Sequence, residues 1–285
     1  MNNRKVVYGV LSIIILVSVV CGVVLYYLSE SKKIKVAFLD VGQGDAVLVS
    51  KGAHQILIDG GPDSAALLEE LGKQIPFWDR NIEIVVATHP DGDHIDGLIS
   101  VFENYNVDQF WHTNADKDTS VNRKLLQSVA EESGVEDITA FRGLDVDIDG
   151  DIFLEVIYPF SQDVNDVKDV NDTSLAIVSK IAGEVFYLGG DLSSEIEDVL
   201  SVGSEITVLK AGHHGSNSST SEEFLAKAKP RDVIISAGEN NRHAHPHEEV
   251  LGRITKAEAN TYRTDKNGTI TYECDKIGCK VLLDS

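Results

Sequence analysis

The sequence contains little cysteine and little positive charge. It has three cysteines in 285 residues, and 25 lysine and arginine residues stand against 46 aspartate and glutamate residues, so the formal net charge is −21. This charge argues against a broad basic face that would bind a phosphate backbone. A bound metal ion can still supply local positive charge in such a protein. Hydrophobic residues make up 42% of the chain, which is ordinary for a folded protein and argues against wholesale disorder.

The few cysteines leave two interpretations open. Cys274 and Cys279 flank a short turn near the C-terminus, between strands expected over residues 269–273 and 280–283. They either form a disulfide across this hairpin or remain free thiols on neighbouring strands. A disulfide fits an extracytoplasmic location. Without a second pair or nearby histidines, the two cysteines make a poor zinc site.

An uncharged apolar run covers residues 6–28. Its length matches a transmembrane helix better than the shorter apolar core of a cleaved signal peptide, and no small-residue cleavage site follows it. Basic residues flank the run on both sides, so the positive-inside rule gives no clear orientation. We expect residues 1–33 to be a membrane anchor, or an uncleaved signal, with a linker. Residues 34–285 are then one large domain outside the membrane.

The stretch most typical of a functional site is residues 88–96, Thr-His-Pro-Asp-Gly-Asp-His-Ile-Asp. Two imidazoles and three carboxylates fall within eight of these residues. The preceding run over residues 82–87 is apolar and rich in β-branched side chains, which predicts a buried strand. Pro90 stops this strand, and Gly92 permits a tight turn.

The side chains of His89, Asp91, Asp93 and His94 can therefore converge at the end of the strand. Histidine nitrogen and carboxylate oxygen are the usual ligands of zinc, manganese and iron. Several carboxylates placed together repel one another, and a divalent cation removes that cost. The alternative is a polar loop whose aspartates only cap the backbone.

The rest of the chain alternates predicted strands, helices and polar loops, and its second half loosely mirrors the first. Helices are expected over residues 95–103 and 193–200, among others. Polar clusters directly follow apolar runs, and sites in open α/β sheets gather at the carboxyl ends of strands. We therefore expect two mixed sheets covered by helices. The clusters are Asp59 after 55–58, residues 88–96 after 82–87, Asp191 after 184–188, His213 and His214 after 206–210, and His245 after 232–236.

The central motif resembles a known family signature. His89-x-Asp91-x-Asp93-His94 matches the pattern H-x-[HD]-x-D-H of the metallo-β-lactamase-fold hydrolases. Further blocks follow in an order similar to the extracytoplasmic hydrolase domain of the ComEC-type DNA-uptake (competence) proteins and its free-standing relatives. The resemblance covers residues 34–270. These blocks are Leu-Asp-Val-Gly-Gln-Gly-Asp at 39–45, Ile-Asp-Gly-Gly at 58–61, Asn-Asp-Thr-Ser-Leu at 171–175, Gly-Gly-Asp at 189–191, Gly-His-His-Gly-Ser at 212–216 and His-Pro at 245–246.

This resemblance implies a four-layer αβ/βα sandwich, the metallo-β-lactamase fold, with a site for two divalent metal ions along one edge. The ligands that it implies are His89 and Asp91 for one ion, Asp93 and His94 for the other, Asp191 between them, and either His213 or His214 for the first ion. The other histidine of that last pair would orient its neighbour.

Two positions depart from the commonest pattern of the superfamily. Asp91 and Asn171 stand where many members carry histidine, and the ComEC-like branch shares both changes. They make the first site poorer in nitrogen and richer in oxygen. The expected metal therefore shifts from zinc toward manganese or magnesium, and one site becomes weaker.

The resemblance also gives roles to residues around the ligands. Asp59 is implied to be a buried carboxylate behind them. His245 either ligates the second ion or protonates a leaving phosphate oxygen, and Asp93 could accept the proton of a bridging water. Asp45 is either a turn residue of a Gly-rich loop or a carboxylate of the cleft. Ser216 either caps the backbone or contacts a phosphate.

These features predict a metal-dependent hydrolase that uses a metal-bridging water as its nucleophile. The expected activity is that of a phosphodiesterase or nuclease acting outside the membrane, with DNA among its substrates. The chain lacks the many membrane spans of a DNA channel, so DNA uptake would require a separate channel protein. The alternatives are a cell-envelope phosphodiesterase acting on teichoic acid that carries phosphorylcholine, and a non-catalytic binding domain.

Overall fold

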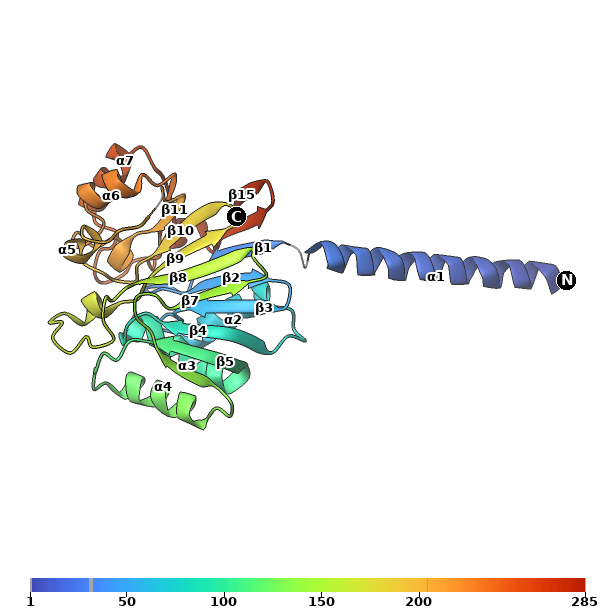
Figure 1. The fold of residues 1–285 in the computed structure, drawn as a ribbon. Coiled ribbons are helices and arrows are strands. Elements are labelled where there is room, and N and C mark those ends of the chain that lie inside the picture. Colours follow the sequence, from blue (N-terminus) through green and yellow to red (C-terminus); the bar gives the residue numbers. More distant parts are fainter. Residues whose placement is uncertain (1, 31–32, 204, 285) are drawn as a thin grey trace.

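The computed structural model describes residues 2–30, 33–203 and 205–284, and within the first range the side chains of residues 4 and 7–22. Helix α1 (Asn2–Glu30) points away from the rest of the molecule (Figure 1). Within the described part of the chain, no helix combines the length and the apolar character needed to cross a membrane. The predicted transmembrane helix is therefore not confirmed.

The first of two sheets has eight strands and mixed direction. Its four strands from β3 to β6 run parallel, and the others pair antiparallel. In spatial order the strands are β15 (Gly278–Leu283), β14 (Ile270–Asp275), β1 (Ile34–Phe38), β2 (Val47–Lys51), β3 (His54–Ile58), β4 (Asn81–Ala87), β5 (Asn106–His112) and β6 (Glu136–Thr139).

The second sheet has seven strands. The strands from β10 to β13 run parallel, while those from β7 to β10 pair antiparallel. In spatial order they are β13 (Asn260–Arg263), β12 (Asp232–Ile235), β11 (Val208–Lys210), β10 (Glu184–Leu188), β9 (Ala176–Ile181), β8 (Ile152–Tyr158) and β7 (Asp145–Ile148).

The two sheets pack face to face and helices cover their outer faces (Figure 1). Side chains alternate along β1, so that Val36 and Phe38 join the core between the sheets and Ala37 joins the core under the helices. Helices α2 (Ser64–Gln74), α3 (Gly92–Asn104) and α4 (Ser120–Glu131) cover the first sheet. Helices α6 (Glu222–Ala228) and α7 (Glu248–Lys256) cover the second. The predicted four-layer αβ/βα sandwich is therefore confirmed.

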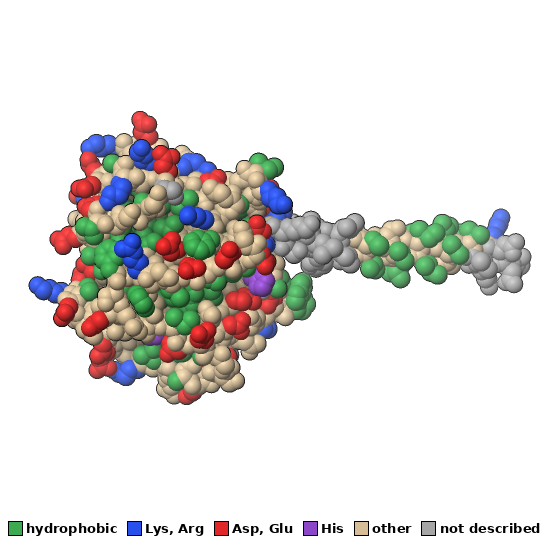
Figure 2. All heavy atoms as spheres, in the orientation of Figure 1, with side chains coloured by type: hydrophobic (Ala, Val, Ile, Leu, Met, Phe, Trp, Pro, Cys, Tyr) green, Lys and Arg blue, Asp and Glu red, His purple; other side chains and the backbone are tan. Residues whose placement is uncertain are grey.

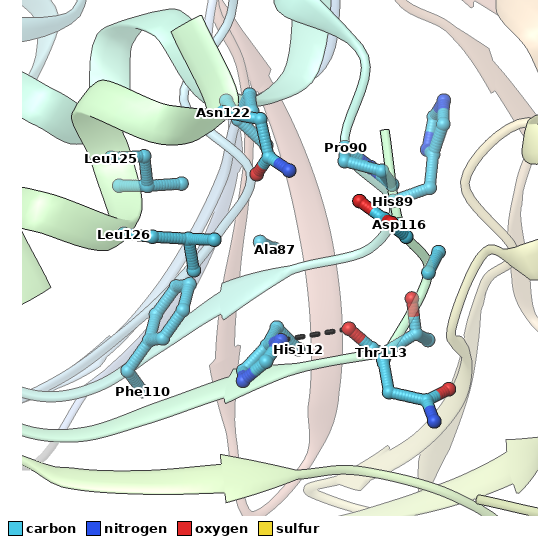
Figure 3. A pocket seen from close by; sticks show the side chains of 13 residues that line it. Ala87, His89, Pro90, Phe110, His112, Thr113, Asp116, Asn122, Leu125 and Leu126 are labelled. Carbon is cyan, nitrogen blue, oxygen red and sulfur yellow. Dashed lines mark hydrogen bonds between the residues drawn. The ribbon is translucent and has the colours of Figure 1, made fainter. Parts of the chain in front are cut away.

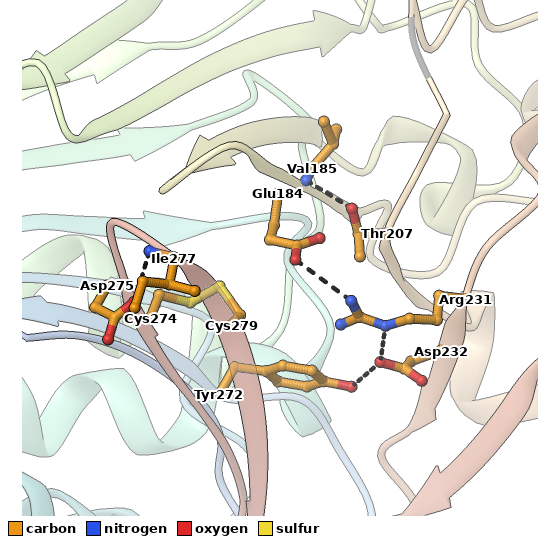
Figure 4. The surroundings of a disulfide bond; sticks show 10 residues. All are labelled: Glu184, Val185, Thr207, Arg231, Asp232, Tyr272, Cys274, Asp275, Ile277 and Cys279. Atoms are coloured by element: carbon orange, nitrogen blue, oxygen red, sulfur yellow. Dashed lines mark hydrogen bonds and ion pairs between the residues drawn. A yellow bond between two sulfur atoms is a disulfide. The ribbon is translucent and has the colours of Figure 1, made fainter.

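A polar contact between Tyr272 and Asp232 joins the two sheets inside the molecule. The hydroxyl of Tyr272 on β14 donates to Asp232 Oδ2 on β12 at 3.0 Å, and the same oxygen accepts from Arg231 Nε at 3.0 Å. Figure 4 shows this contact beside the disulfide between Cys274 and Cys279. The two cysteines face each other across the β14–β15 hairpin. Of the two interpretations of the sequence, the structure adopts the disulfide.

Some element boundaries differ from those expected. Helix α3 begins at Gly92 rather than at residue 95, and α5 (Ser194–Glu197) is shorter than the expected 193–200. Gly92 does not form a tight turn, because it is the first residue of the helix, and Asp91 before it has the extended backbone of a helix N-cap. Asp93 and His94 therefore project from the first helical turn, which fixes their directions.

Candidate metal centre

The loops that follow β4, β10, β11 and β12 meet at one cleft with a volume of about 630 Å³. Strands that run parallel end at the same edge of their sheet, which is why residues far apart in the sequence come together here. The predicted site residues that line the cleft are Asp91, Asp93, Asn171, Asp191, His213, His214 and His245.

Asp59 lies behind the site and holds Thr88 and His94 in position. Its carboxylate accepts hydrogen bonds from the backbone N–H of Thr88 at 2.8 Å and from the Thr88 hydroxyl at 2.7 Å. The Nδ1 of His94 lies 2.8 Å from the same carboxylate. Because Nδ1 is held by Asp59, the Nε2 of His94 is directed into the site. Asp59 is thus the buried carboxylate behind the site, where the resemblance places it.

His89 is held in a similar way by hydroxyl groups. Its Nδ1 lies 3.1 Å from the Thr88 hydroxyl and 3.2 Å from the Ser174 hydroxyl. Ser174 also accepts from the backbone N–H of Asp191 at 3.1 Å, so one serine links two strand ends. Burial and the nearby charge of His94 hold the pKa of His89 well below its usual range. His89 is therefore neutral, as a metal-binding imidazole must be.

His94, Asp191 and His214 form the centre of the cluster. The distance from His94 Nε2 to Asp191 Oδ2 is 3.3 Å, and the distance from His214 Nε2 to the same oxygen is 3.4 Å. His214 Nε2 is also 3.4 Å from Asp93 Oδ2. Four groups of potential ligand atoms form among the described residues, each with its atoms within 4.8 Å of one another. Two of them, His89–His94–Asp191 and Asp93–His94–His214, include neither Asp45 nor Asp59.

The atoms that face one another here fit a metal ion. Among the described residues, His89 Nε2, His94 Nε2, His214 Nε2 and Asp191 Oδ1 are buried and have no hydrogen-bond partner. Buried polar atoms are almost always paired, so several orphans at one point call for an explanation. Imidazole nitrogens with carboxylate oxygens are the donor set of zinc, manganese and iron. We conclude that these residues are able to hold divalent metal.

Protons and one lysine balance the charge of the cluster in the metal-free chain. Burial disfavours the charged imidazoles of His94 and His214, but Asp191 and the neighbouring carboxylates hold the pKa of both well above the usual range. The same imidazoles lower the pKa of Asp191 and Asp93, against the effect of burial. The carboxylates are therefore ionised and the imidazoles are the groups that carry exchangeable protons.

Lys210 is a member of the site that the sequence did not predict. It is the last residue of β11 and is fully buried, and its ammonium group contacts the carboxylate of Asp45. The ammonium group also donates to the carbonyl of Gly190 at 3.1 Å and lies 3.8 Å from Asp191 Oδ1. A lysine at the end of an otherwise apolar buried strand indicates a carboxylate nearby, because a buried charge requires a partner.

Asp45 lies behind His214 rather than on the cleft wall. Its Oδ1 is 3.3 Å from His214 Nδ1, and its other oxygen contacts Lys210. The carboxylate is almost completely buried. The Nδ1 of His214 hydrogen-bonds to the Ser236 carbonyl at 3.1 Å, and Asp45 places a negative charge beside that nitrogen on the side away from the cleft.

The structure distinguishes the two neighbouring histidines. His214 is buried within the cluster, whereas the His213 side chain is 31% exposed and its Nε2 is 3.8 Å from Asp191 Oδ2. Both residues have left-handed backbone angles in η2 (Gly212–Gly215), so their rings point in different directions. The hydroxyl of Ser218 lies 3.4 Å from His213 Nδ1. Which of the pair binds metal stays a prediction, and the geometry favours His214.

Asp91 stands apart from both groups of ligand atoms. Its carboxylate contacts the ammonium group of Lys117, which comes from the loop between β5 and α4. Asn171, in η1 (Val170–Thr173), lines the cleft but belongs to neither group. The Ser216 hydroxyl lies 2.9 Å from that of Ser218. The structure thus does not bring Asp91, Asn171 or Ser216 to the centre of the cluster.

His245 forms the opposite wall of the cleft. Its ring centroid is 5.6 Å from that of His213 and 5.5 Å from that of His243. Burial, together with the surrounding imidazoles, lowers the pKa of His245 to about 4. Its Nδ1 is buried and has no hydrogen-bond partner among the described residues. A neutral ring with a free nitrogen is available to a metal ion or to a substrate oxygen.

The fold and this site identify the class of the protein. The family model described as the metallo-beta-lactamase superfamily matches residues 39–239, and the chain belongs to that superfamily. The same fold is seen in the metallo-beta-lactamase fold protein YhfI from Bacillus subtilis, with a TM-score of 0.57 and 12% sequence identity. That comparison covers 85% of this chain and 99% of YhfI.

Within the superfamily, the chain is similar to proteins of the ComEC type. It is 33% identical to ComE operon protein 3 of Bacillus subtilis over 84% of this chain and 33% of that protein. It is 25% identical to competence protein ComA of Neisseria gonorrhoeae over 85% of this chain and 32% of that protein. The predicted resemblance is confirmed, and the chain spans about a third of the length of the curated relatives it matches.

Proposed function

We propose that this protein is a metal-dependent phosphodiesterase that acts outside the membrane, with DNA as its leading substrate class. The observation that carries the proposal is the pair of ligand groups that share His94 at the base of the cleft. Their unpartnered nitrogen and oxygen atoms come from three separate strand ends. A scaffold for binding alone would not require such a set.

Two divalent ions held at these groups would lower the pKa of a water and stabilise the charge of a phosphodiester under attack. Side-chain and backbone groups of the protein hold the metal-binding rings in position, and side chains transfer protons. Asp59 holds the ring of His94 in place, and the Ser236 carbonyl holds the ring of His214. Asp93 lines the cleft and is the carboxylate that would accept a proton from a water there. His245 on the opposite wall can bind a phosphate oxygen or donate to it.

Three observations support DNA as substrate or a location outside the membrane. One of the relatives is named a competence protein, and the disulfide between Cys274 and Cys279 is of a kind that persists in oxidising compartments. Arg242 supplies a cation at the cleft wall, where it could contact a phosphate. We propose a DNA-channel protein as a partner in DNA transport.

A second candidate is a cell-envelope phosphodiesterase that acts on phosphorylcholine esters. The net charge of −21 favours it, because an acidic protein attracts a cationic choline group and repels a polyanion. On the face in Figure 2, Asp and Glu side chains are spread over the surface of the domain and Lys and Arg are scattered among them. Both candidates use the same metal centre and differ only in the substrate.

The test uses the full chain, stripped of metal and then supplied with Mn²⁺, Zn²⁺ or Mg²⁺. We measure hydrolysis of three substrates: bis(p-nitrophenyl) phosphate, labelled DNA and p-nitrophenyl phosphorylcholine. The unaltered chain is compared with Asp93→Ala and His94→Ala. The control is His54→Ala, whose imidazole is exposed and belongs to none of the ligand groups. We expect metal-dependent cleavage that only the control retains.

The pattern of substrates then separates the candidates. Cleavage of DNA supports a nuclease, and cleavage of the choline ester alone supports the envelope enzyme. Stoichiometric metal binding without turnover of any phosphodiester would overturn the proposed activity. Absence of metal binding would leave a non-catalytic binding domain.

A further inference from the structure

A second cavity lies directly beside the metal cleft. It has a volume of about 230 Å³ and sits between α4 and the ends of β4 and β5, as Figure 3 shows. Neither the motifs in the sequence nor the proposed mechanism gives it a role. Its size is sufficient for one flat ring system rather than for a folded polymer.

The cavity and the metal cleft share their boundary. Pro90 forms part of the cavity wall, and the next residue, Asp91, lines the metal cleft. The loop between β5 and α4 spans both, since Asp116 lines the cavity and Lys117 contacts Asp91. A substrate whose phosphate lies at the metal centre would thus bring an adjacent group to the mouth of the cavity.

The walls of the cavity are largely apolar and partly aromatic. Leu126 of α4 is 41% exposed, although it is a large hydrophobic side chain. The rings of Phe110 and His112 are stacked, with centroids 5.0 Å apart and planes inclined by 15°. The His112 ring is fixed, because its nitrogens lie 2.7 Å from the Thr113 carbonyl and 2.9 Å from Asp137 Oδ1. Such walls favour a flat ring as ligand.

The polar groups of the cavity include hydroxyl and amide groups and the carboxylate of Asp116, a set that disfavours an anion and suits a ring that forms hydrogen bonds. Thr113 is 5% exposed, and its hydroxyl is buried without a hydrogen-bond partner among the described residues. The side-chain amides of Asn114 and Asn122 also line the cavity. Its lining includes no lysine or arginine, so a phosphate or carboxylate would find no cation there. Hydroxyl and amide groups match the mixed donors and acceptors on the edge of a nucleobase.

We propose that this cavity is a base-binding subsite, which receives a nucleobase of a strand whose phosphodiester lies at the metal centre. The proposal rests on the proposed function. It also resolves the conflict between an acidic chain and a polyanionic substrate, because stacking and base-edge hydrogen bonds provide affinity without a basic groove. The substrate is then single-stranded or locally unpaired, since a base pair is too large for a cavity of this volume.

The test compares two substrates in three variants of the full chain loaded with metal. One substrate is a single-stranded oligonucleotide and the other is an oligomer of the same length built from abasic tetrahydrofuran units. Leu126→Ser removes apolar wall, Thr113→Val removes the unpartnered hydroxyl, and Val199→Ser changes an exposed side chain elsewhere. We expect Leu126→Ser and Thr113→Val each to lower kcat/KM for the base-bearing strand about tenfold and to leave kcat/KM for the abasic strand unchanged. Val199→Ser should leave kcat/KM unchanged for both substrates.

Equal loss on both substrates, or equal cleavage of both by the unaltered chain, would overturn the subsite. A measurement without catalysis keeps this separate from the proposed function. Saturation-transfer NMR with thymidine and deoxyadenosine on the metal-free chain should show binding that Leu126→Ser abolishes. This binding would support the subsite even if the chain proved inactive. Transfer to choline with none to either nucleoside would overturn it in favour of the envelope substrate.

Discussion

Replacing Lys210 by methionine should destabilise the metal-free protein strongly. The lysine side chain is 2% exposed, and its ammonium group contacts the carboxylate of Asp45, which is 4% exposed. Methionine fills a similar volume but removes the ammonium group from that carboxylate and leaves only the imidazoles of His214 and His94 beside it. Removing one partner of a buried ion pair costs about 3–5 kcal/mol. For a domain of this size that corresponds to a fall in Tm of about 6–20 °C.

The assay is thermal unfolding of the metal-free chain, and two further variants sharpen it. Lys256→Met breaks an exposed ion pair with Glu222 and should change stability by less than about 0.5 kcal/mol. The double variant Lys210→Met with Asp45→Asn removes both charges and should recover much of the loss. If the double variant is no more stable than Lys210→Met alone, the loss does not come from an unpaired Asp45, and the reasoning is wrong.

Three other measurements follow from the same structure. Asp59→Asn should weaken metal binding about 10–100-fold in calorimetric titration, because an amide cannot hold His94 in the same tautomer as firmly; an unchanged affinity would contradict the role given to Asp59. Metal binding should release protons and tighten as the pH rises, because the pKa values of His94 and His214 are raised in the metal-free chain; a binding heat that does not depend on the ionisation enthalpy of the buffer would rule this out. Burial raises the pKa of Glu197 to about 8 from its ordinary 4.5, so between these two pH values the folded protein binds a proton that the unfolded chain does not. The protein should therefore lose at most about 5 kcal/mol of stability as the pH rises from 4.5 to about 8. Glu197→Gln should lose this pH dependence in urea unfolding, and an unchanged slope would show that another group titrates.

The layers of the fold were predictable because its central strands are continuous apolar runs that end in polar clusters. Residues 82–87 predict β4 for this reason, and the strand is found at Asn81–Ala87. The edge strands β6 (Glu136–Thr139) and β13 (Asn260–Arg263) were not predicted. Both are polar and largely exposed, so their local sequence carries no strand signal. Their structure comes from pairing with β5 and β12, which is a tertiary effect.

The sequence predicted which residues belong to the site better than it predicted the contacts between those residues. A motif shows that His213 and His214 lie near the ligands, but both have positive φ angles, which the residue types do not indicate. Lys210 was missed for a related reason. Its side chain reaches carboxylates that come from a different sheet and a different loop, and only the packing of the two sheets brings them together.

The neighbours of each carboxylate explain why some of these groups face the cleft as candidate ligands and others lie behind it. Asp45 is neutralised by Lys210, and Asp59 by the ring of His94 and the donors of Thr88. Neither needs a metal ion.

Asp93 and Asp191 face imidazoles in the cleft, and Lys210 lies 3.8 Å from the other oxygen of Asp191. Those imidazoles should give up their protons when metal enters. Asp91 is a third case, because its carboxylate is already paired with Lys117 and must lose that contact before it binds metal. The group formed by Asp93, His94 and His214 should therefore fill first, and the position that uses Asp91 should be the weaker of the two.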